Sequence, residues 1–312
     1  MTYTYFPGCG SKGTGRPYDE SLMAVFEALG SGLDALDDWN CCGATAYPAV
    51  DVAQGMALCA RNLALAEKAQ AGPRPVDVVA PCAGCYRALL KTERAMAEGG
   101  DMAERVGNAL GAAGLRYGGH ARVRHPLDVL VNDVGLERIK AAAVRPLTGL
   151  RVACYYGCLL VRPYAVFDDT REPTSMERLF RALGAEPVDW PMRTTCCGGS
   201  CYCGGPVVGP LPDATLHLSH NLLADAKKRG AEVVVTTCPL CQFNLEAFQG
   251  QMARRYGDRA DLTVGFFTQL LGVALGIPPR KLGIQRLTRW KLPEPAPARK
   301  PADVKEAAGA NA

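Results

Sequence analysis

The chain has 312 residues, of which 48% are hydrophobic and 21% are charged, and its formal net charge is +4. These values are typical of a globular protein, and the length suffices for one large domain or two ordinary ones. The small net charge and the lack of a Lys/Arg-rich block argue against a nucleic-acid partner.

Neither a secretory nor a membrane-spanning segment is expected. The residues from Met1 to Pro7 lack the basic and apolar regions of a signal peptide. The most apolar stretch, Phe266 to Ile277, is too short for a spanning helix, which needs roughly 20 residues. We therefore predict a cytoplasmic protein. Thiols stay reduced in that compartment, so a cysteine-rich chain is more often metal-binding or catalytic than disulfide-linked.

The first half of the chain is predicted to alternate strands with helices. A β-rich run covers Thr2 to Phe6, and an amphipathic helix follows and ends at Gly30. A second helix begins near Asp51, and a buried strand covers Val76 to Ala80. Such alternation indicates βαβ units and a parallel sheet.

The second half repeats this order. Arg151 to Tyr156 matches the first strand, a helix of equal length ends at Gly184, and Glu232 to Thr236 matches the buried strand. The period of about 155 residues is too long for a solenoid repeat. We predict an α/β fold of two homologous domains from an internal duplication, residues 1–146 and 147–288. A tail rich in Pro, Ala and Lys follows at 289–312.

Ten of the 14 cysteines repeat with the rest of the sequence. Each half has a lone cysteine after the first strand, then a Cys-Cys-Gly turn, then a CxxC after the buried strand. The first set is Cys9, Cys41, Cys42, Cys82 and Cys85, and the second is Cys158, Cys196, Cys197, Cys238 and Cys241. Ligands of parallel α/β sheets bind beyond the carboxyl ends of the strands, so five thiols are expected to converge at that edge in each half.

Several kinds of site use such cysteines. A thioredoxin-like dithiol or a structural disulfide would leave the vicinal pairs and the fixed order unexplained. Haem attachment needs a His after CxxC, where this chain has Tyr86 and Gln242. Zinc takes four ligands and would leave a fifth thiol idle in each half. An iron–sulfur cluster uses several thiolates and tolerates unusual geometry, and it is the interpretation we favour.

The duplicated order of Cys, Cys-Cys-Gly and CxxC resembles that of the CCG-domain family. It is most similar to the B subunit of heterodisulfide reductase, including the B subunit of bacterial sulfur-oxidising heterodisulfide-reductase-like systems. The similarity covers roughly residues 2 to 285 and includes the run from Cys158 to Pro163.

This resemblance implies a function. Each five-cysteine set would bind a noncubane [4Fe-4S] cluster, and the chain would be the iron–sulfur subunit of an oxidoreductase complex that cleaves or forms a disulfide or related sulfur bond. Its partners in the complex would be the flavin/iron–sulfur A subunit and the ferredoxin-like C subunit. Its substrate would be a disulfide or a protein-bound sulfur, such as that on a lipoate-binding carrier.

Two other functions stay open on the sequence. One is the CCG-domain electron-transfer subunit of a lactate, glycolate or succinate oxidoreductase. The other is a zinc-stabilised module without redox activity.

The sequence leaves the roles of a few other residues open. Cys154 competes with Cys158 for the first ligand position of the second set, and the aromatic-Gly-Cys context favours Cys158. Cys201 and Cys203 follow the second Cys-Cys-Gly turn, and Cys59 is expected in the core.

His217 and His220 share a helix face, which is more typical of surface packing than of a metal pair. Four basic residues flank the cysteine motifs and would suit a negative cluster or substrate: Lys12, Arg16, Arg87 and Arg162.

Overall fold

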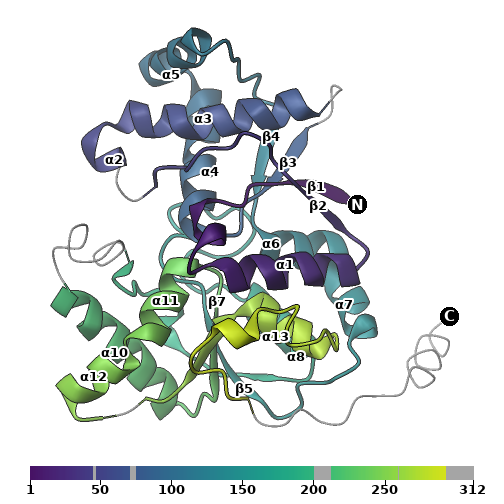
Figure 1. Ribbon diagram of the computed structural model, residues 1–312, viewed down its shortest axis with the longest axis vertical. Helices are drawn as coiled ribbons and strands as arrows, with labels where there is room; N and C mark the ends of the chain where they lie inside the picture. The colour runs from purple at the N-terminus through teal and green to yellow at the C-terminus, as the bar shows by residue number, and fades with distance from the viewer. Residues whose placement is uncertain (45–46, 71–74, 200–211, 259, 293–312) are drawn as a thin grey trace. The chain divides into compact units, whose positions relative to one another are not determined.

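The computed structural model describes residues 1–44, 47–70, 75–199, 212–258 and 260–292 of the chain. It contains two four-stranded parallel sheets (Figure 1). Two compact units hold one sheet each: Met1–Gly13 with Ser31–Pro126, and Thr14–Gly30 with Leu127 onward.

The first unit carries the sheet of order β2-β1-β3-β4. Its strands are β1 (Thr2–Tyr5), β2 (Gly32–Ala35), β3 (Val76–Val79) and β4 (Ala121–Arg124). Its helical segments are a 3-10 turn (Cys9–Lys12), α2 (Tyr47–Val50), α3 (Val52–Ala69), α4 (Ala83–Glu98) and α5 (Gly100–Ala112). The buried side chains of β3 and of α3 supply much of this core, as their apolar patterns predict.

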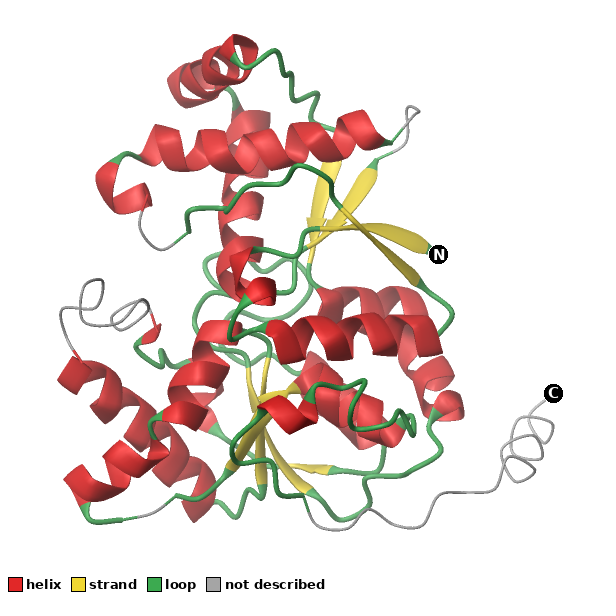
Figure 2. Cartoon of the chain, viewed as in Figure 1, coloured by secondary structure: helices red, strands yellow, loops and turns green. Residues whose placement is uncertain are grey.

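The second unit carries the sheet of order β6-β5-β7-β8. Its strands are β5 (Arg151–Tyr155), β6 (Glu186–Pro187), β7 (Val233–Thr236) and β8 (Thr263–Phe266). Its α-helices are α1 (Arg16–Ala28), α7 (Leu136–Ala142), α8 (Ser175–Ala182), α10 (Pro212–Lys228), α11 (Pro239–Ala247), α12 (Gln249–Tyr256) and α13 (Phe267–Ala274). Shorter segments are α6 (Pro126–Asp128), a π-helical run (Val129–Gly135), and 3-10 turns at Pro191–Thr194 and Ile284–Arg286. Helices and strands are distinguished by colour in Figure 2.

The two sheets have the same strand order in homologous strands, which confirms the duplicated α/β fold. In each sheet, the strand that carries the CxxC at its C-terminal end lies beside the first strand of that half. These pairs are β3 beside β1 and β7 beside β5. The apolar stretch from Phe266 to Ile277 begins with the last residue of β8 and continues through the buried helix α13.

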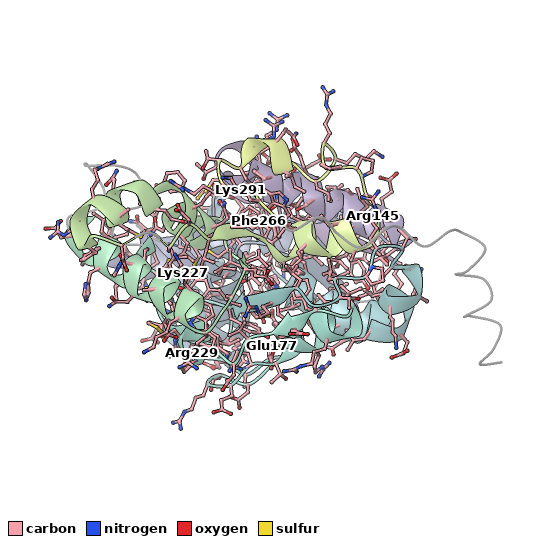
Figure 3. The ribbon with its side chains drawn as sticks, turned by 90° about the horizontal axis from the view of Figure 1, so that it is seen from below. Arg145, Glu177, Lys227, Arg229, Phe266 and Lys291 are labelled. Carbon is pink, nitrogen blue, oxygen red and sulfur yellow. The ribbon has the colours of Figure 1, made fainter. Side chains whose placement is uncertain are left out.

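The first helices of the two halves are exchanged within the second unit. Helix α1, from the first half, packs on α13, the last helix of the second half, where the ring of Tyr18 stacks on that of Phe266 at 4.4 Å. Helix α8, from the second half, packs on α7, the last helix of the first half. Figure 1 shows α1 beside α13, and Figure 3 labels Phe266 among the side chains of this unit.

Because of this exchange, the two compact units do not coincide with the two duplicated halves of the chain. Helix α1 falls in the predicted range 1–146 but belongs to the second compact unit. The ranges 1–146, 147–288 and 289–312 therefore stay predictions of where the duplicated segments end. Most of the predicted tail lies outside the described residues.

Candidate metal centres

The cysteines of each set follow the C-terminal ends of three neighbouring strands. In the first unit Cys9 follows β1, Cys41 follows β2, and Cys82 follows β3. Parallel strands all end at the same edge, so the three loops meet there. Cys82 is also the N-cap residue of α4, and its counterpart Cys238 is the N-cap residue of α11. A helix N-terminus favours negative charge, which suits a thiolate ligand.

Four of the five thiols of the first set lie in one contact network: Cys41, Cys42, Cys82 and Cys85. The Sγ atoms of Cys42 and Cys85 are 3.1 Å apart, and both thiols are buried. The contact with Cys41 lowers the pKa of the Cys42 thiol, and Cys85 adds to this effect. Contact with Cys42, and then with Cys82, raises the pKa of Cys85. Contact with Cys42, and then burial, raises the pKa of the Cys41 thiol, and the charge of Cys9 adds to this effect. Cys9 and Cys41 are both exposed.

The second set repeats the contacts of the buried thiols, but the first cysteine of its pair contacts the lone cysteine instead of its neighbour. The Sγ atoms of Cys197 and Cys241 are 3.4 Å apart. Contact with Cys197, and then with Cys238, raises the pKa of the Cys241 thiol. Contact with Cys158 lowers the pKa of Cys196. Cys158 and Cys196 are half-buried, so this set is more enclosed than the first.

Glycines permit this convergence at two places in each set. Gly8 and Gly157 have φ angles of +69° and +68°, and a Cβ atom there would lie 3.1 Å from Cys85 Sγ and 3.2 Å from Cys241 Sγ. The glycine of each Cys-Cys-Gly turn also has a positive φ. Its N–H donates to the first thiol of the pair, from Gly43 to Cys41 Sγ at 3.4 Å and from Gly198 to Cys196 Sγ at 3.2 Å. Glycine adopts such angles at little cost, so each turn can point its N–H at sulfur.

The helix after each turn holds the second cysteine of the pair by its backbone. Cys59 Sγ donates to the carbonyl oxygen of Cys42 at 3.3 Å, and Ser219 Oγ donates to that of Cys197 at 3.0 Å. Burial raises the pKa of the Cys59 thiol to about 12, which leaves it protonated and able to donate. Cys59 therefore lies in the core, as expected, and supports the ligand loop from there.

Replacing Cys59 with serine is expected to preserve the iron content, because the hydroxyl can make the bond that Ser219 makes in the second half. Alanine removes the donor and should lower the free energy of unfolding by about 1–2 kcal/mol. Urea unfolding and iron analysis of both variants check this, with Ser219→Ala as the matched change in the other half. A loss of iron in C59S would show instead that Cys59 is a ligand.

An aromatic pair flanks each set, a feature that the sequence analysis missed. The ring of Phe6 lies 5.6 Å from that of Trp39, and the ring of Tyr155 lies 5.7 Å from that of Trp190. Phe6 and Tyr155 each lie three residues before the lone cysteine of their set. The sequence repeat could therefore have indicated these two aromatic residues. The two tryptophans lie at different distances from the Cys-Cys-Gly turn, so no common spacing indicates them.

Tyr155 is also bound to the loop that carries the second cysteine pair. Its hydroxyl donates to the Thr195 carbonyl oxygen at 2.6 Å, directly before Cys196. Burial, and then the charges of four thiols of the second set, raise the pKa of Tyr155 well above its usual value. The phenol therefore stays protonated and keeps donating to this loop.

Cys154 lies with different neighbours from Cys158. The pKa of Cys154 is raised by burial and then by the charge of Glu177, whose carboxylate accepts a hydrogen bond from the Tyr156 hydroxyl. Cys158 instead contacts Cys196. Side chains two apart on a strand share a face, so Cys154 and Tyr156 face Glu177 while Tyr155 faces the ligand thiols. This geometry favours Cys158 as the ligand. Figure 3 labels Glu177.

The two histidines singled out in the sequence have partners other than the cysteines. Cys201 and Cys203 lie outside the described residues. His220 Nε2 lies 2.8 Å from a carboxylate oxygen of Asp258, and His217 Nε2 lies 3.1 Å from the Asn221 side chain. His217 therefore has a partner on its own helix, and His220 has one in the segment that follows α12.

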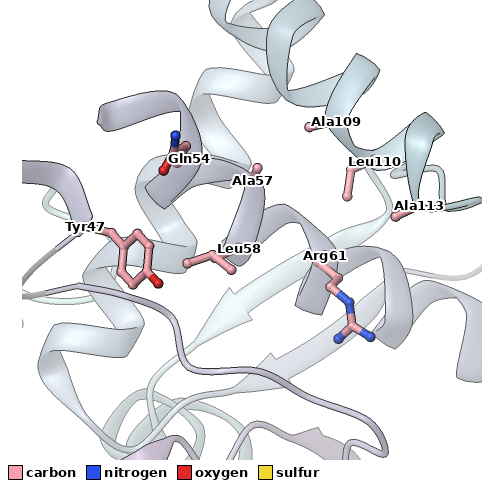
Figure 4. A pocket seen from close by; sticks show the side chains of 8 residues that line it. All are labelled: Tyr47, Gln54, Ala57, Leu58, Arg61, Ala109, Leu110 and Ala113. Atoms are coloured by element: carbon pink, nitrogen blue, oxygen red, sulfur yellow. The ribbon is translucent and has the colours of Figure 1, made fainter. Parts of the chain in front are cut away.

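A groove of about 320 Å³ lies between α3 and α5 in the first unit (Figure 4). Its lining is mainly apolar, with Tyr47 and Leu58 on one side and Leu110 on the other. The guanidinium of Arg61 is paired with Asp38 at 2.5 Å. None of the ten cysteines lines this groove, so we do not assign it to the metal centres.

Each donor set has five thiols, one more than the four ligands that a zinc ion takes. No disulfide bond joins the cysteines that the structure describes. Across the described ranges, no group of three His, Cys, Asp or Glu side chains converges in a way that would hold one metal ion. A set of five thiols that are close in pairs, with glycines where sulfur approaches the backbone, suits ligands spread over several metal atoms.

Comparison with known proteins gives the family. The cysteine-rich domain called CCG matches this chain twice, at residues 3–90 and 152–246. The chain therefore belongs to the CCG family of cysteine-rich proteins. Both matched regions contain a complete five-cysteine set, which confirms the predicted family and the duplication.

Particular relatives lie within two groups of this family. The chain is 31% identical over 284 residues to the 8-methylmenaquinol:fumarate reductase membrane anchor subunit of Wolinella succinogenes, covering 90% of this chain and 95% of that protein. It is 30% identical over 259 residues to the B subunit of the ferredoxin:CoB-CoM heterodisulfide reductase of Methanosarcina mazei, covering 81% and 83%. It is 30% identical over 288 residues to a protein of Archaeoglobus profundus that is named as like the heterodisulfide reductase B subunit, covering 90% and 93%.

A solved structure supports the fold alone. A crystal structure of a hypothetical protein from Helicobacter pylori matches with a TM-score of 0.72 at 14% identity. The match covers 93% of this chain and 52% of the other, so this chain spans about half the length of that protein. No helix among the residues described here combines the length and apolar character needed to cross a bilayer.

Proposed function

We propose that the chain binds two noncubane [4Fe-4S] clusters, one in each five-cysteine set. The observation that carries this proposal is that two separate sets of five cysteines, in the same order along the chain, lie at the same edge of homologous sheets and share a contact between the second cysteine of the pair and the second cysteine of the CxxC. The ligands would be Cys9, Cys41, Cys42, Cys82 and Cys85 for the first cluster, and Cys158, Cys196, Cys197, Cys238 and Cys241 for the second.

When bound, such a cluster supplies one-electron redox chemistry at iron atoms that can also hold a substrate sulfur. The residues of the chain make this possible in three ways. The N–H groups of Gly43 and Gly198 stabilise a thiolate in each pair. The buried thiols Cys42 and Cys197 anchor the inner side of each site, and the outer thiols leave an accessible side.

We further propose that the chain is the iron–sulfur subunit of a heterodisulfide-reductase-like complex that acts on sulfur groups. The relatives named for the heterodisulfide reductase B subunit support this, because they match over most of both chains. The other members of the complex would be the flavin/iron–sulfur A subunit and the ferredoxin-like C subunit. The substrate would be a disulfide or a protein-bound sulfur, such as one on a lipoate-binding carrier, and the complex would work in the cytoplasm.

A second candidate is the CCG subunit of a fumarate-reductase-type complex. The relative from Wolinella succinogenes favours it, since that protein is named for such a complex and matches this chain over 90% of its length. In that case the two sites would pass electrons between a quinone pool and a flavin subunit rather than act on a disulfide.

Anaerobic purification of the tagged chain with its natural partners distinguishes the two candidates. We expect a flavin/iron–sulfur subunit and a ferredoxin-like subunit to co-purify, and the complex to oxidise a reduced electron donor with a disulfide but not with fumarate. Recovery of a flavin dehydrogenase subunit, with fumarate as the effective acceptor, would support the second candidate and contradict the first.

A further inference from the structure

The two sites differ in how their nearby cations are held. We infer that Arg162, held by a hydrogen bond that Lys12 lacks within the described residues of the first site, fixes a positive charge at the second site, and that this charge raises the reduction potential of the second cluster. The inference rests on the proposed function in one respect, since it requires that a cluster is bound.

Arg162 joins two ligand-bearing loops of the second unit. It lies four residues after Cys158, and its Nη2 atom donates to the carbonyl oxygen of Thr194, two residues before Cys196. The side chain is exposed, yet this bond holds the guanidinium at the half-buried edge of the site. Among the described residues no carboxylate forms an ion pair with it, so its charge is not neutralised by any of them.

Arg162 is also close enough to the Cys196 thiol for its charge to act on that side chain. The pKa of the Cys196 thiol is lowered, first by contact with Cys158 and, among further causes, by the charge of Arg162. A guanidinium is charged at every accessible pH, so its influence on the site does not depend on titration.

The corresponding cation of the first site has a different position. Lys12 lies three residues after Cys9, at the end of the 3-10 turn. Its Nζ atom is placed over the ring of Trp39, 5.2 Å from the centroid. The ammonium therefore contacts the aromatic face of a residue that lies two before Cys41, whereas Arg162 makes a hydrogen bond to the backbone two residues before Cys196. Within the described part of the chain, Lys12 makes no hydrogen bond to the loop that carries Cys41 and Cys42.

The sign of the expected change in reduction potential follows from the charge of the cluster and of Arg162. Reduction adds one negative charge to a cluster that already carries several thiolates, and net charge and hydrogen bonding are among the features that set its potential. A fixed cation stabilises the reduced form more than the oxidised form. Removing it must therefore make reduction of the second cluster less favourable.

An anaerobic redox titration of the purified holoprotein, followed by electron paramagnetic resonance, tests this inference. Arg162→Gln is expected to lower the reduction equilibrium constant of one cluster about tenfold, equivalent to about 59 mV for a one-electron couple, and to leave the other unchanged. Lys12→Gln, the matched change at the first site, should shift neither couple by as much. Arg162→Lys keeps the charge and should stay within about threefold of the wild type.

The outcomes separate this inference from the proposed function. A wild-type protein that binds no iron would contradict the proposed function. Two clusters with normal iron content, but with no shift or equal shifts in R162Q, would overturn the role of Arg162. If R162Q fails to assemble, R162K decides the matter: a tenfold loss at full iron content would show that charge is not the cause.

Discussion

Replacing Cys42 with serine is expected to remove the first cluster and leave the second. The Cys42 thiol is 4% exposed, contacts Cys85 Sγ at 3.1 Å, and has its carbonyl oxygen bound by Cys59. Its neighbours cannot move to replace it, because a close-packed interior resists such shifts. Serine oxygen is a harder and poorer ligand for iron–sulfur chemistry than a thiolate. The iron content should fall from about eight to about four atoms per chain.

The matched variant in the second site is Cys197→Ser, which should remove the other half of the iron. C59S serves as the control, since it changes a buried cysteine of the same unit that we do not assign as a ligand. Electron paramagnetic resonance of the two ligand variants should show complementary signals. An unchanged iron content in C42S would exclude Cys42 as an essential ligand.

Replacing Gly8 with alanine is expected to damage the first site through two separable effects. Gly8 has φ +69° and ψ 164°, a backbone region that is essentially restricted to glycine, so alanine should cost about 1–3 kcal/mol of stability. In addition, the new Cβ would lie 3.1 Å from Cys85 Sγ, which must shift. The first effect acts on folding, and the second acts on a ligand of the cluster.

Gly99 provides a control for the first effect alone. It has φ +78° and ψ −155°, and a Cβ there would meet nothing within 4 Å. Gly99→Ala should therefore lower the free energy of unfolding by a similar amount while leaving the iron content unchanged. Urea unfolding and iron analysis measure the two effects. Equal iron contents in G8A and G99A would show that the close approach of Gly8 to Cys85 is not required.

Much of the site could be predicted from the sequence because cysteine spacing and strand order depend on local pattern. The strand before Cys82 is apolar and β-branched, so its burial was predictable, and β3 ends at Val79, one residue before the predicted end at Ala80. Once the strands are parallel, the convergence of the lone cysteine, the pair and the CxxC follows from topology. The assignment of the ten cysteines as cluster ligands remains a proposal.

Tertiary packing was not predictable in the same way. The apolar face of α1 indicates that Leu22, Val25 and Phe26 are buried, and all three are. It does not indicate that the partner helix is α13, which belongs to the other half of the duplicated sequence. The pairing of Tyr155 with Trp190 has the same origin, since an aromatic contact between distant residues leaves no periodic signal.

The most direct test of the central claim is the metal and sulfide content of the anaerobically purified protein. The account predicts about eight iron atoms and about eight acid-labile sulfides per chain, with absorption and paramagnetic signals of [4Fe-4S] clusters. A colourless protein that contains one or two zinc ions per chain, and no iron, would contradict it.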